Sequence, residues 1–208
     1  MKITRPLDNI LNTAVKIRIL RFLCRTGAEW NGRQIAREIG VTPKAAHKAL
    51  NTLNKEKVLL LRNMGKTHVY SLNVDNFLVS KLLKPLFLKE DNILDDIINV
   101  IRRKISASKA RKDILSVAIF GSISAHEDHP ASDVDIVVIV KNVKAKAAAE
   151  RLFEEIDEKI SKQFGNVISP YLNTKTEFKA KQKKGLAVIK DILKSHNLIY
   201  GERLERLL

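Results

Sequence analysis

The chain has 208 residues, of which 45% are hydrophobic, and its formal net charge is +15 at pH 7. This length allows one large or two small domains, each with a core of its own. Because it contains no run of 18 apolar, uncharged residues and no apolar N-terminal secretory signal, we expect a cytoplasmic protein with no membrane partner.

The positive charge is concentrated at the N-terminal end. Residues 1–74 hold 14 Lys and Arg against 4 Asp and Glu, a balance of +10, whereas residues 75–208 hold 24 against 19, a balance of +5. Such a basic segment has the electrostatic footprint of a nucleic-acid binder. Solvated basic faces are also common, so the pattern of residues must decide between the two.

Three helices are predicted in this basic segment. Apolar residues recur at helical spacing over 15–23, and a second short helix occupies 30–40. Thr42 is an expected N-cap and Pro43 an expected first helical residue, so a third helix follows over 44–57. Two short helices joined by a tight turn are typical of a helix-turn-helix. The single cysteine, Cys24, excludes an intrachain disulfide and is expected to be buried.

Two strands follow the third helix directly. Residues 58–62 and 67–72 are predicted strands around a turn at 63–66, and a hairpin in this place is a wing. The segment from about 8 to 74 therefore resembles the winged helix-turn-helix regulators of the MarR and ArsR type. The resemblance implies that residues 1–74 form a DNA-binding domain for double-stranded DNA. Because such regulators commonly bind two half-sites, it also implies a homodimer.

The expected DNA contacts are the residues that packing leaves outside. Ala46, Ala49, Leu50 and Leu53 share the inward stripe of the third helix, and Lys44 and Lys48 are more suited to phosphates than to bases. The candidate DNA-binding residues are Thr42, Lys44, Ala45, His47, Lys48, Asn51, Arg62, Lys66 and His68. Asn51 has the side chain to bind an adenine edge, and the alternative for each lysine is a solvated surface charge.

Residues 75–110 are predicted to form a helical connector. Helical apolar stripes indicate two helices broken near Pro85, the second running over about 91–108. These helices could pack on the sheet that follows, form a dimer interface, or do both. A simple spacer is the alternative, and it would leave much apolar surface exposed.

The next segment carries polar groups at the ends of two predicted strands. An apolar run ends at Gly121 and Ser122, and a second strand carries Asp133 and Asp135 with one residue between them. Alternate strand residues point to one face, so the two carboxylates lie roughly 6.5–7 Å apart along the chain on the same side. Two such carboxylates suit a divalent cation, and a glycine allows the backbone to approach phosphate.

These residues resemble the nucleotidyltransferase superfamily that includes DNA polymerase β, in its minimal single-domain form. Its pattern of Gly-Ser, a loop and Ser-Asp-x-Asp is matched by Gly121, Ser122, Ser132, Asp133 and Asp135. The resemblance implies that Asp133 and Asp135 are catalytic and metal-binding, that Gly121, Ser122 and Ser132 bind nucleotide, and that Mg²⁺ (or Mn²⁺) and a nucleoside triphosphate are bound. It also implies a mixed sheet with flanking helices over 111–208, so the whole chain is of the α+β or α/β class. An Asp-x-Asp at the mouth of an ordinary strand is the alternative.

Two features depart from the family pattern. The usual Ala-Arg-Gly of the loop is replaced by residues 124–126, which read Ser-Ala-His. Active members place a third carboxylate on the next strand, but the predicted strand over 166–172 contains no acid, and Ser169 stands at the expected position. The nearest downstream acid, Glu177, belongs to a capping-box pattern at the start of a helix.

The remaining segments complete the predicted domain. A charged amphipathic helix is expected over 144–164, and a final helix over 177–195 precedes a C-terminal tail. His126 and His129 lie in the loop before Asp133, where they could contact phosphate or substrate or simply be solvated. Their spacing is not a recognised zinc pattern.

Two functions are compatible with these residues. One is a DNA-binding transcriptional regulator whose nucleotidyltransferase-fold domain binds Mg²⁺-nucleotide with weak or no turnover. The alternative is an active nucleotidyltransferase that transfers a nucleotidyl group to a small molecule, a protein or an RNA end. The absent third carboxylate favours the first, and the intact Gly-Ser and Asp-x-Asp favour the second.

Overall fold

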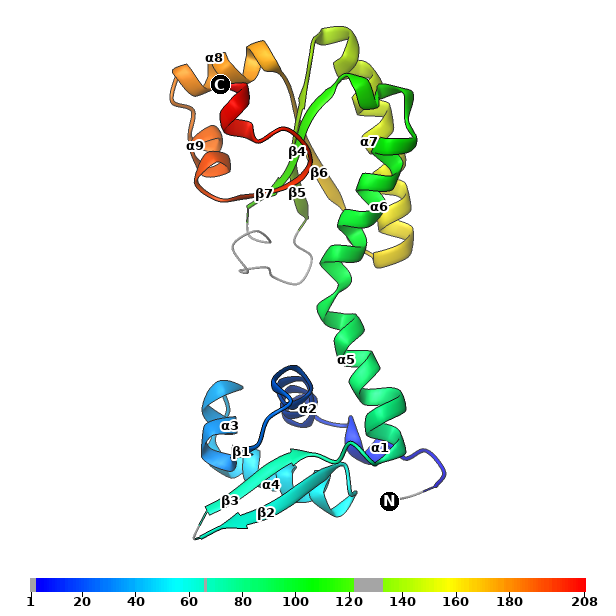
Figure 1. The fold of residues 1–208 in the computed structure, drawn as a ribbon, viewed down its shortest axis with the longest axis vertical. Coiled ribbons are helices and arrows are strands. Elements are labelled where there is room, and N and C mark those ends of the chain that lie inside the picture. The colour runs from blue at the N-terminus through cyan, green and yellow to red at the C-terminus, as the bar shows by residue number, and fades with distance from the viewer. Residues whose placement is uncertain (1–2, 66, 122–132) are drawn as a thin grey trace. The chain divides into compact units, whose positions relative to one another are not determined.

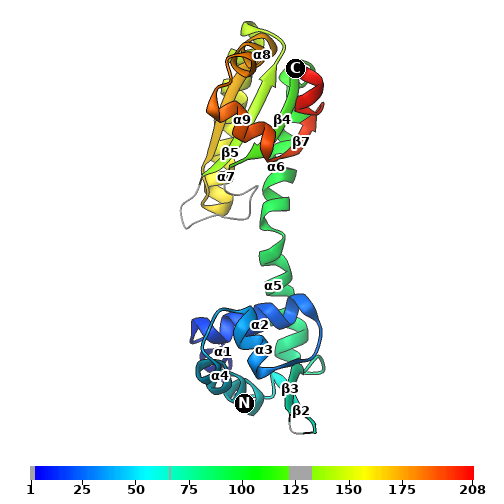
Figure 2. The same cartoon turned by 90° about the vertical axis from the view of Figure 1, so that its left-hand side faces the viewer.

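The computed structural model describes residues 3–65, 67–121 and 133–208. The chain divides into two compact units, Met1–Ile93 and Leu94–Leu208, which Figures 1 and 2 show from two sides. Over these described ranges, no helix has both the length and the apolar character needed to cross a membrane.

Short helices build most of the first unit, and the sequence predicted all of them except the four-residue α1. They are α1 (Leu7–Ile10), α2 (Ala14–Thr26), α3 (Gly32–Glu38) and α4 (Pro43–Lys55). Asn31 caps α3 in a complete capping box with Gln34, and the Thr42 side chain accepts a hydrogen bond from the Ala45 N–H at the start of α4. The caps fix where each helix begins, and with them the turn between α3 and α4.

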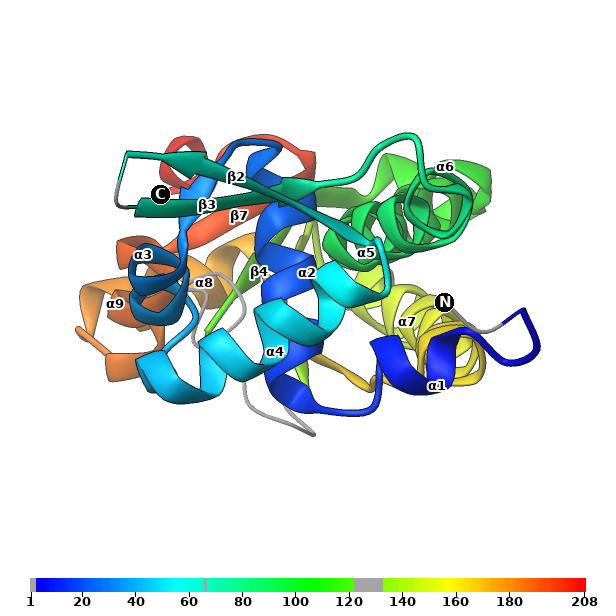
Figure 3. The same cartoon turned by 90° about the horizontal axis from the view of Figure 1, so that it is seen from below.

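A three-stranded antiparallel sheet completes the winged fold. Its strands are β1 (Trp30–Asn31), β2 (Leu59–Met64) and β3 (Thr67–Leu72), in the order β1-β3-β2. Leu59 pairs with Leu72 and Met64 with Thr67, so the predicted hairpin is confirmed. Figure 3 faces this hairpin and α4. The short β1 had no sequence signal of its own, since it exists only through pairing with β3.

The core of this unit extends past the hairpin into the predicted connector. A wide π-type turn, η1 (Val79–Leu83), runs straight into α5 (Lys84–Asp91), and Leu83 and Phe87 are buried with α2 and α4. The predicted break near Pro85 is wrong, because proline is tolerated in the first turn of a helix and the wide turn precedes it. The helix ends instead at Asp91, with Asn92 as its C-cap. Cys24 is buried as expected, and burial raises the pKa of its thiol to about 11.

The second unit is built on a mixed four-stranded sheet. Its strands are β4 (Ile114–Phe120), β5 (Val134–Val140), β6 (Ile168–Thr174) and β7 (His196–Gly201), in the order β6-β5-β4-β7. Only β5 and β6 pair in parallel. The helical segments are α6 (Ile93–Ala107), η2 (Lys109–Lys112), α7 (Val143–Phe164), α8 (Lys175–Lys183), α9 (Ala187–Lys194) and η3 (Leu204–Leu207).

The two faces of this sheet are covered by different helices. Figures 1 and 2 show α6 and α7 on one face and α8 and α9 on the other. Val134, Ile136 and Val138 of β5 belong to the core under α6 and α7, whereas Val137 and Ile139 belong to the core under α8 and α9. A strand buried on both faces explains the unbroken apolar run in the sequence.

Two C-terminal elements differ from their prediction. The single helix expected over 177–195 is two helices, α8 and α9, because Gly185 between them has φ +67°, outside the helical region. The expected tail contains the edge strand β7, which pairs antiparallel with β4. At Gly201, with φ +82°, a Cβ atom would collide with the Leu115 backbone carbonyl, so only glycine fits.

Candidate functional site at the start of β5

Three predicted site residues meet where β4 ends and β5 begins. Asp133 directly precedes β5, Asp135 is its second residue, and Gly121 directly follows β4. A Cβ atom on Gly121 would overlap the Asp135 carboxylate, and Gly121 has φ +76°. Gly121 therefore lies close to the Asp135 carboxylate, and its left-handed backbone conformation favours glycine.

The charge of Asp135 is unfavourable in this place. Burial raises the pKa of the Asp135 carboxyl, and the nearby charge of Asp133 raises that pKa further. A divalent cation would relieve both effects, because it replaces lost hydration and separates two like charges. Across the described residues, no group of three or more His, Cys, Asp or Glu side chains could hold a metal ion. The chemistry available in this part of the site is thus that of two carboxylates.

The neighbouring strand places a hydroxyl beside Asp135. Ser169 is the register partner of Asp135 in the parallel β5–β6 pair, and its side chain is exposed. Side chains at paired positions lie on the same face of a sheet. Tyr171 and Asn173 continue that face, and β6 carries no acidic residue. Ser169 consequently occupies the place on β6 nearest to the carboxylate pair.

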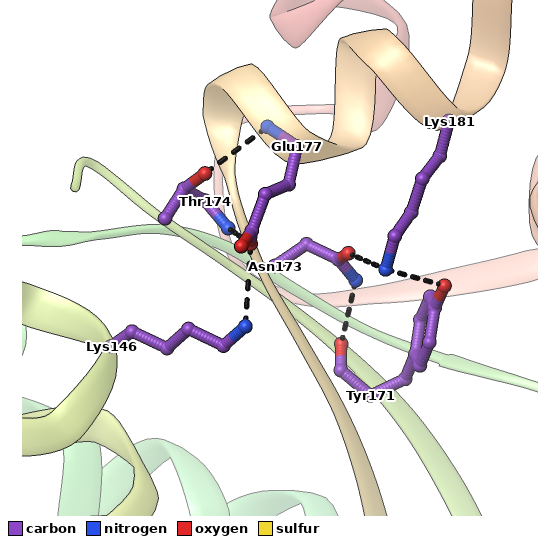
Figure 4. Close-up of polar contacts among 6 residues, drawn as sticks. All are labelled: Lys146, Tyr171, Asn173, Thr174, Glu177 and Lys181. Carbon is purple, nitrogen blue, oxygen red and sulfur yellow. Dashed lines mark hydrogen bonds and ion pairs between the residues drawn. The ribbon is translucent and has the colours of Figure 1, made fainter. Parts of the chain in front are cut away.

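Glu177 lies at the other end of β6 and has a structural role (Figure 4). Its carboxylate accepts a hydrogen bond from the Thr174 N–H at 2.8 Å and lies 3.3 Å from the Lys146 ammonium. The Thr174 N–H bond, helped by Lys146, lowers the pKa of Glu177. Thr174 is five residues from Ser169, roughly 16 Å along the strand. Glu177 is therefore too distant to join Asp133 and Asp135.

A second polar network lies on this face, and no sequence motif predicted it. The Lys181 ammonium, from α8, donates to Asn173 Oδ1 at 2.6 Å and to the Tyr171 hydroxyl at 2.9 Å (Figure 4). It also lies 4.6 Å from the centre of the Tyr171 ring. Asn173 is fully buried, so these contacts supply the partners that a buried amide needs.

In the first unit, α4 exposes the predicted DNA-binding side chains. Lys44, His47, Lys48 and Asn51 are exposed, Ala45 is half-buried, and Thr42 caps the helix. His47 Nδ1 lies 3.4 Å from Asn51 Nδ2. The opposite side of α4 is buried at Ala46, Ala49, Leu50 and Leu53. The helix therefore separates its packing face from a polar face.

The wing contributes fewer unpartnered groups than the sequence suggested. The Arg62 guanidinium pairs with the Glu29 carboxylate, and His68 Nδ1 lies 2.6 Å from Asn63 Oδ1. An open hollow of about 530 Å³ lies between α4 and β3. It is lined by Asn31, Gly32, Arg33, Pro43, His47, Thr67, His68 and Tyr70. Arg33 and Tyr70 also line this hollow, although helical or strand periodicity did not place them among the predicted DNA-binding residues.

Several predicted residues lie outside the described ranges. These are Lys66 on the wing and Ser122, His126, His129 and Ser132 in the segment before Asp133. Their expected contacts with DNA, phosphate or substrate stay predictions.

Comparisons with known structures find likenesses over part of the chain. The winged helix-turn-helix DNA-binding domain of Mb0332 from Mycobacterium bovis is 20% identical, with coverage of 42% of this chain and 77% of that chain and a TM-score of 0.35. The repressor BigR from Xylella fastidiosa is 18% identical, with coverage of 40% and 81% and a TM-score of 0.35. A toxin-antitoxin crystal structure with AMP-PNP is 16% identical, with coverage of 52% and 76% and a TM-score of 0.31.

The comparison with sequence families gives a clearer result. None of the curated proteins compared with the chain matches it. The family described as polymerase beta, nucleotidyltransferase, matches residues 103–204. That range contains the whole β4-β5-β6-β7 sheet and the Gly121, Asp133 and Asp135 cluster. With its N-terminal unit folded as a winged helix-turn-helix, this chain carries in residues 103–204 a nucleotidyltransferase domain that belongs to the polymerase beta family.

Proposed function

We propose that this protein is a DNA-binding transcriptional regulator whose nucleotidyltransferase domain binds Mg²⁺-nucleotide with weak or no turnover. The observation that carries the proposal is the pairing of Asp135 with Ser169, where a third carboxylate would have to lie. In this proposal residues 1–74 bind DNA, residues 75–110 connect, and residues 111–208 bind nucleotide.

Nucleotide binding is assigned to the end of the sheet near Asp135. Asp133 and Asp135 would hold Mg²⁺, or Mn²⁺ in its place, and Gly121, Ser122 and Ser132 would bind the triphosphate. The close approach of Gly121 to the Asp135 carboxylate supports this arrangement, because a residue without a side chain lets the backbone come near a ligand bound at that carboxylate. The raised pKa of Asp135 supports it too, since a cation would remove the repulsion from Asp133.

Weak turnover follows from the groups around the carboxylate pair. An acceptor hydroxyl must lose a proton during nucleotidyl transfer, and general-base help is typically worth about 10²–10⁴-fold in rate. Ser169 has no basic group at neutral pH, and Glu177 is engaged with Thr174 and Lys146. The domain would then hold nucleotide as a ligand.

Double-stranded DNA is the proposed partner of the winged helix. Lys44 and Lys48 would meet phosphates, Asn51, His47, Ala45 and Thr42 would face the major groove, and Arg62, Lys66 and His68 would lie at the flank. A homodimer is proposed because two half-sites are common for such folds. Sedimentation at high micromolar concentration should give a dimer, and a monomer throughout would remove this part of the proposal.

The test of the nucleotide site uses the full chain with labelled nucleoside triphosphates and Mg²⁺. Wild-type protein should bind nucleotide only with the metal, and Asp133→Asn should abolish that binding. Asp191→Asn is the matched control, since Asp191 is an exposed aspartate on α9. Absence of metal-dependent binding to the wild type would leave the domain as a scaffold and contradict the proposal.

The alternative function is an active nucleotidyltransferase. The intact pair Asp133 and Asp135 favours it, because two carboxylates can hold the metal that activates a triphosphate. Pyrophosphate release by wild-type protein, measured with and without cell extract, decides between the two. Turnover within about a second, in the usual range of enzymes, would show that this site needs no third carboxylate. If it is needed, Ser169→Asp should raise the turnover rate.

A further inference from the structure

A stripe of lysines covers one side of α8. Lys175, Lys179 and Lys183 follow one another at intervals of four residues, so they span a sector of roughly 80° on the helix. Together with Lys141 they line an open hollow of about 470 Å³, whose other lining residues are Thr176 and Ala180. We refer to these four lysines as the α8 lysine stripe.

Little negative charge opposes the α8 lysine stripe. Lys141 lies 3.3 Å from the Asp113 carboxylate, but none of the ion pairs among the described residues involves Lys175, Lys179 or Lys183. Glu177, the acidic residue of α8, lies roughly 160° around the helix from Lys179 and faces Lys146. Figure 4 shows Lys181 on the inner side of α8, bound to Asn173 and Tyr171. Lys175, Lys179 and Lys183 are thus like charges that a ligand, rather than the ion pairs of the described residues, would compensate.

This surface is separate from the proposed nucleotide site. Lys141 follows the last residue of β5 and Lys175 follows the last residue of β6, whereas Asp133 and Asp135 lie at the start of β5. A strand of seven residues separates these two edges of the sheet, a span of roughly 20 Å. A triphosphate held at Asp135 would not reach the stripe.

The spacing of the lysines indicates which kind of anion the stripe would bind. Residues four apart rise by about 6 Å along a helix, so the stripe presents a row of ammonium groups rather than one convergent pocket. A row suits an extended anion with regularly repeated charges, and lysine acts on phosphate as a point charge without reading a base. We infer that the α8 lysine stripe binds the sugar-phosphate backbone of a nucleic acid, as a second contact surface in addition to the winged helix.

The experiment measures binding of full-length protein to duplex DNA and to single-stranded RNA as a function of salt. The starting variant carries Lys44→Gln and Lys48→Gln, so that binding by α4 is weakened independently. Adding Lys175→Gln, Lys179→Gln and Lys183→Gln should reduce the slope of log affinity against log salt by about 2–3 units. The matched control adds Arg151→Gln, Lys159→Gln and Lys162→Gln, which remove the same charge from exposed positions of α7.

The experiment tests the α8 lysine stripe independently of the proposed DNA contacts of α4. If the α8 variant lowers the slope and the α7 control does not, the inference stands, whatever Lys44 and Lys48 contribute. If both variants lower the slope equally, the effect is one of overall charge and the inference is overturned. Competition by inorganic polyphosphate as strong as that by either nucleic acid would also overturn it. Unchanged thermal unfolding of both variants confirms that neither has lost its fold.

Discussion

The polar face of α4 and the Asp133–Asp135 pair at the start of β5 differ in how far their side chains depend on the surrounding structure. On α4, Lys44 and Lys48 are exposed, and the packing of the helix depends on other residues, such as Leu50. At β5, Asp135 is partly buried, is repelled by Asp133 and lies where a side chain on Gly121 would have to go. The side chains of the first set make few contacts within the fold, whereas those of the second act on one another.

The difference predicts how each region responds to mutation. Charges that act separately on phosphates contribute separately, so their losses add. Side chains that would bind the same metal ion, next to the same backbone segment, are coupled. The loss of one of them should therefore abolish metal binding by the whole group. The predictions that follow test this contrast, from the largest effect to the smallest.

Gly121→Ala should have the largest effect. The new methyl group would run into the Asp135 carboxylate, and alanine is strained at φ +76°, so we expect loss of Mg²⁺-nucleotide binding by more than about 100-fold. Titration with labelled nucleotide measures it. Gly165→Ala is the control, because Gly165 has φ +78° and open space around it. A matching loss of binding in the control would show that strain, and not the contact with Asp135, matters.

Replacing Lys44 and Lys48 together by glutamine should weaken DNA binding without abolishing it. Two lost phosphate contacts lower the salt slope by about 1.8 units, so wild type would lose about 12-fold more affinity than the variant between about 50 and 200 mM salt. Fluorescence anisotropy with duplex DNA gives both slopes. The control pair is Lys55→Gln with Lys81→Gln, both exposed in the same unit. An equal change of the salt slope in the control pair would show that the effect comes from net charge and not from phosphate contacts of Lys44 and Lys48.

Asp135→Asn should stabilise the metal-free protein at neutral pH. The pKa of Asp135 is raised in the folded state, so its contribution to stability is fully present below the unfolded pKa and is lost as pH rises through the folded pKa. The midpoint of thermal unfolding in chelator should therefore increase more at neutral than at acid pH. Asp191→Asn should show no such difference. A destabilised Asp135→Asn protein at neutral pH would mean that the carboxylate has a favourable partner.

Glu177→Gln should have the smallest effect. Glutamine keeps the capping box but loses the charge that faces Lys146, and an exposed pair of this kind is worth about 0.5 kcal/mol. Because the pKa of Glu177 is lowered, this stabilisation is present above the unfolded pKa and is lost as pH falls through the folded pKa. Denaturant unfolding at neutral and acid pH measures it. A larger loss of unfolding free energy that persists at acid pH would contradict the view that the charge of Glu177 provides the stabilisation.

The sequence predicted local features better than distant contacts. Thr42 with Pro43 marked the start of α4, and the apolar run around Asp135 marked a strand. These signals act over a few residues. The edge strand β7 exists only because it pairs with β4, roughly eighty residues earlier, and Lys181 meets Asn173 through the docking of α8. No local pattern encodes such partners.

The break at Gly185 shows a different limit. Both α8 and α9 have the composition of one amphipathic helix, and a glycine inside a helix costs only about 1 kcal/mol, so the pattern alone allowed continuation. The backbone at Gly185 instead turns left-handed, which lets α9 fold back over the same face of the sheet. Phe178 of α8 and Ile189 and Ile192 of α9 then share one buried core, which a single straight helix could not provide.

The buried amide of Asn173 has a consequence for the rotation of α8 about its axis. Apolar contacts around Phe178 alone would tolerate several rotational settings of the helix, because they are not directional. The two hydrogen bonds of Lys181, to Asn173 and Tyr171, are directional and select one of those settings. That setting determines which residues of α8 face solvent. Asn173→Leu would leave the helix docked but would remove one constraint on the direction in which Lys175, Lys179 and Lys183 point; the capping box at Thr174 and Glu177 is another.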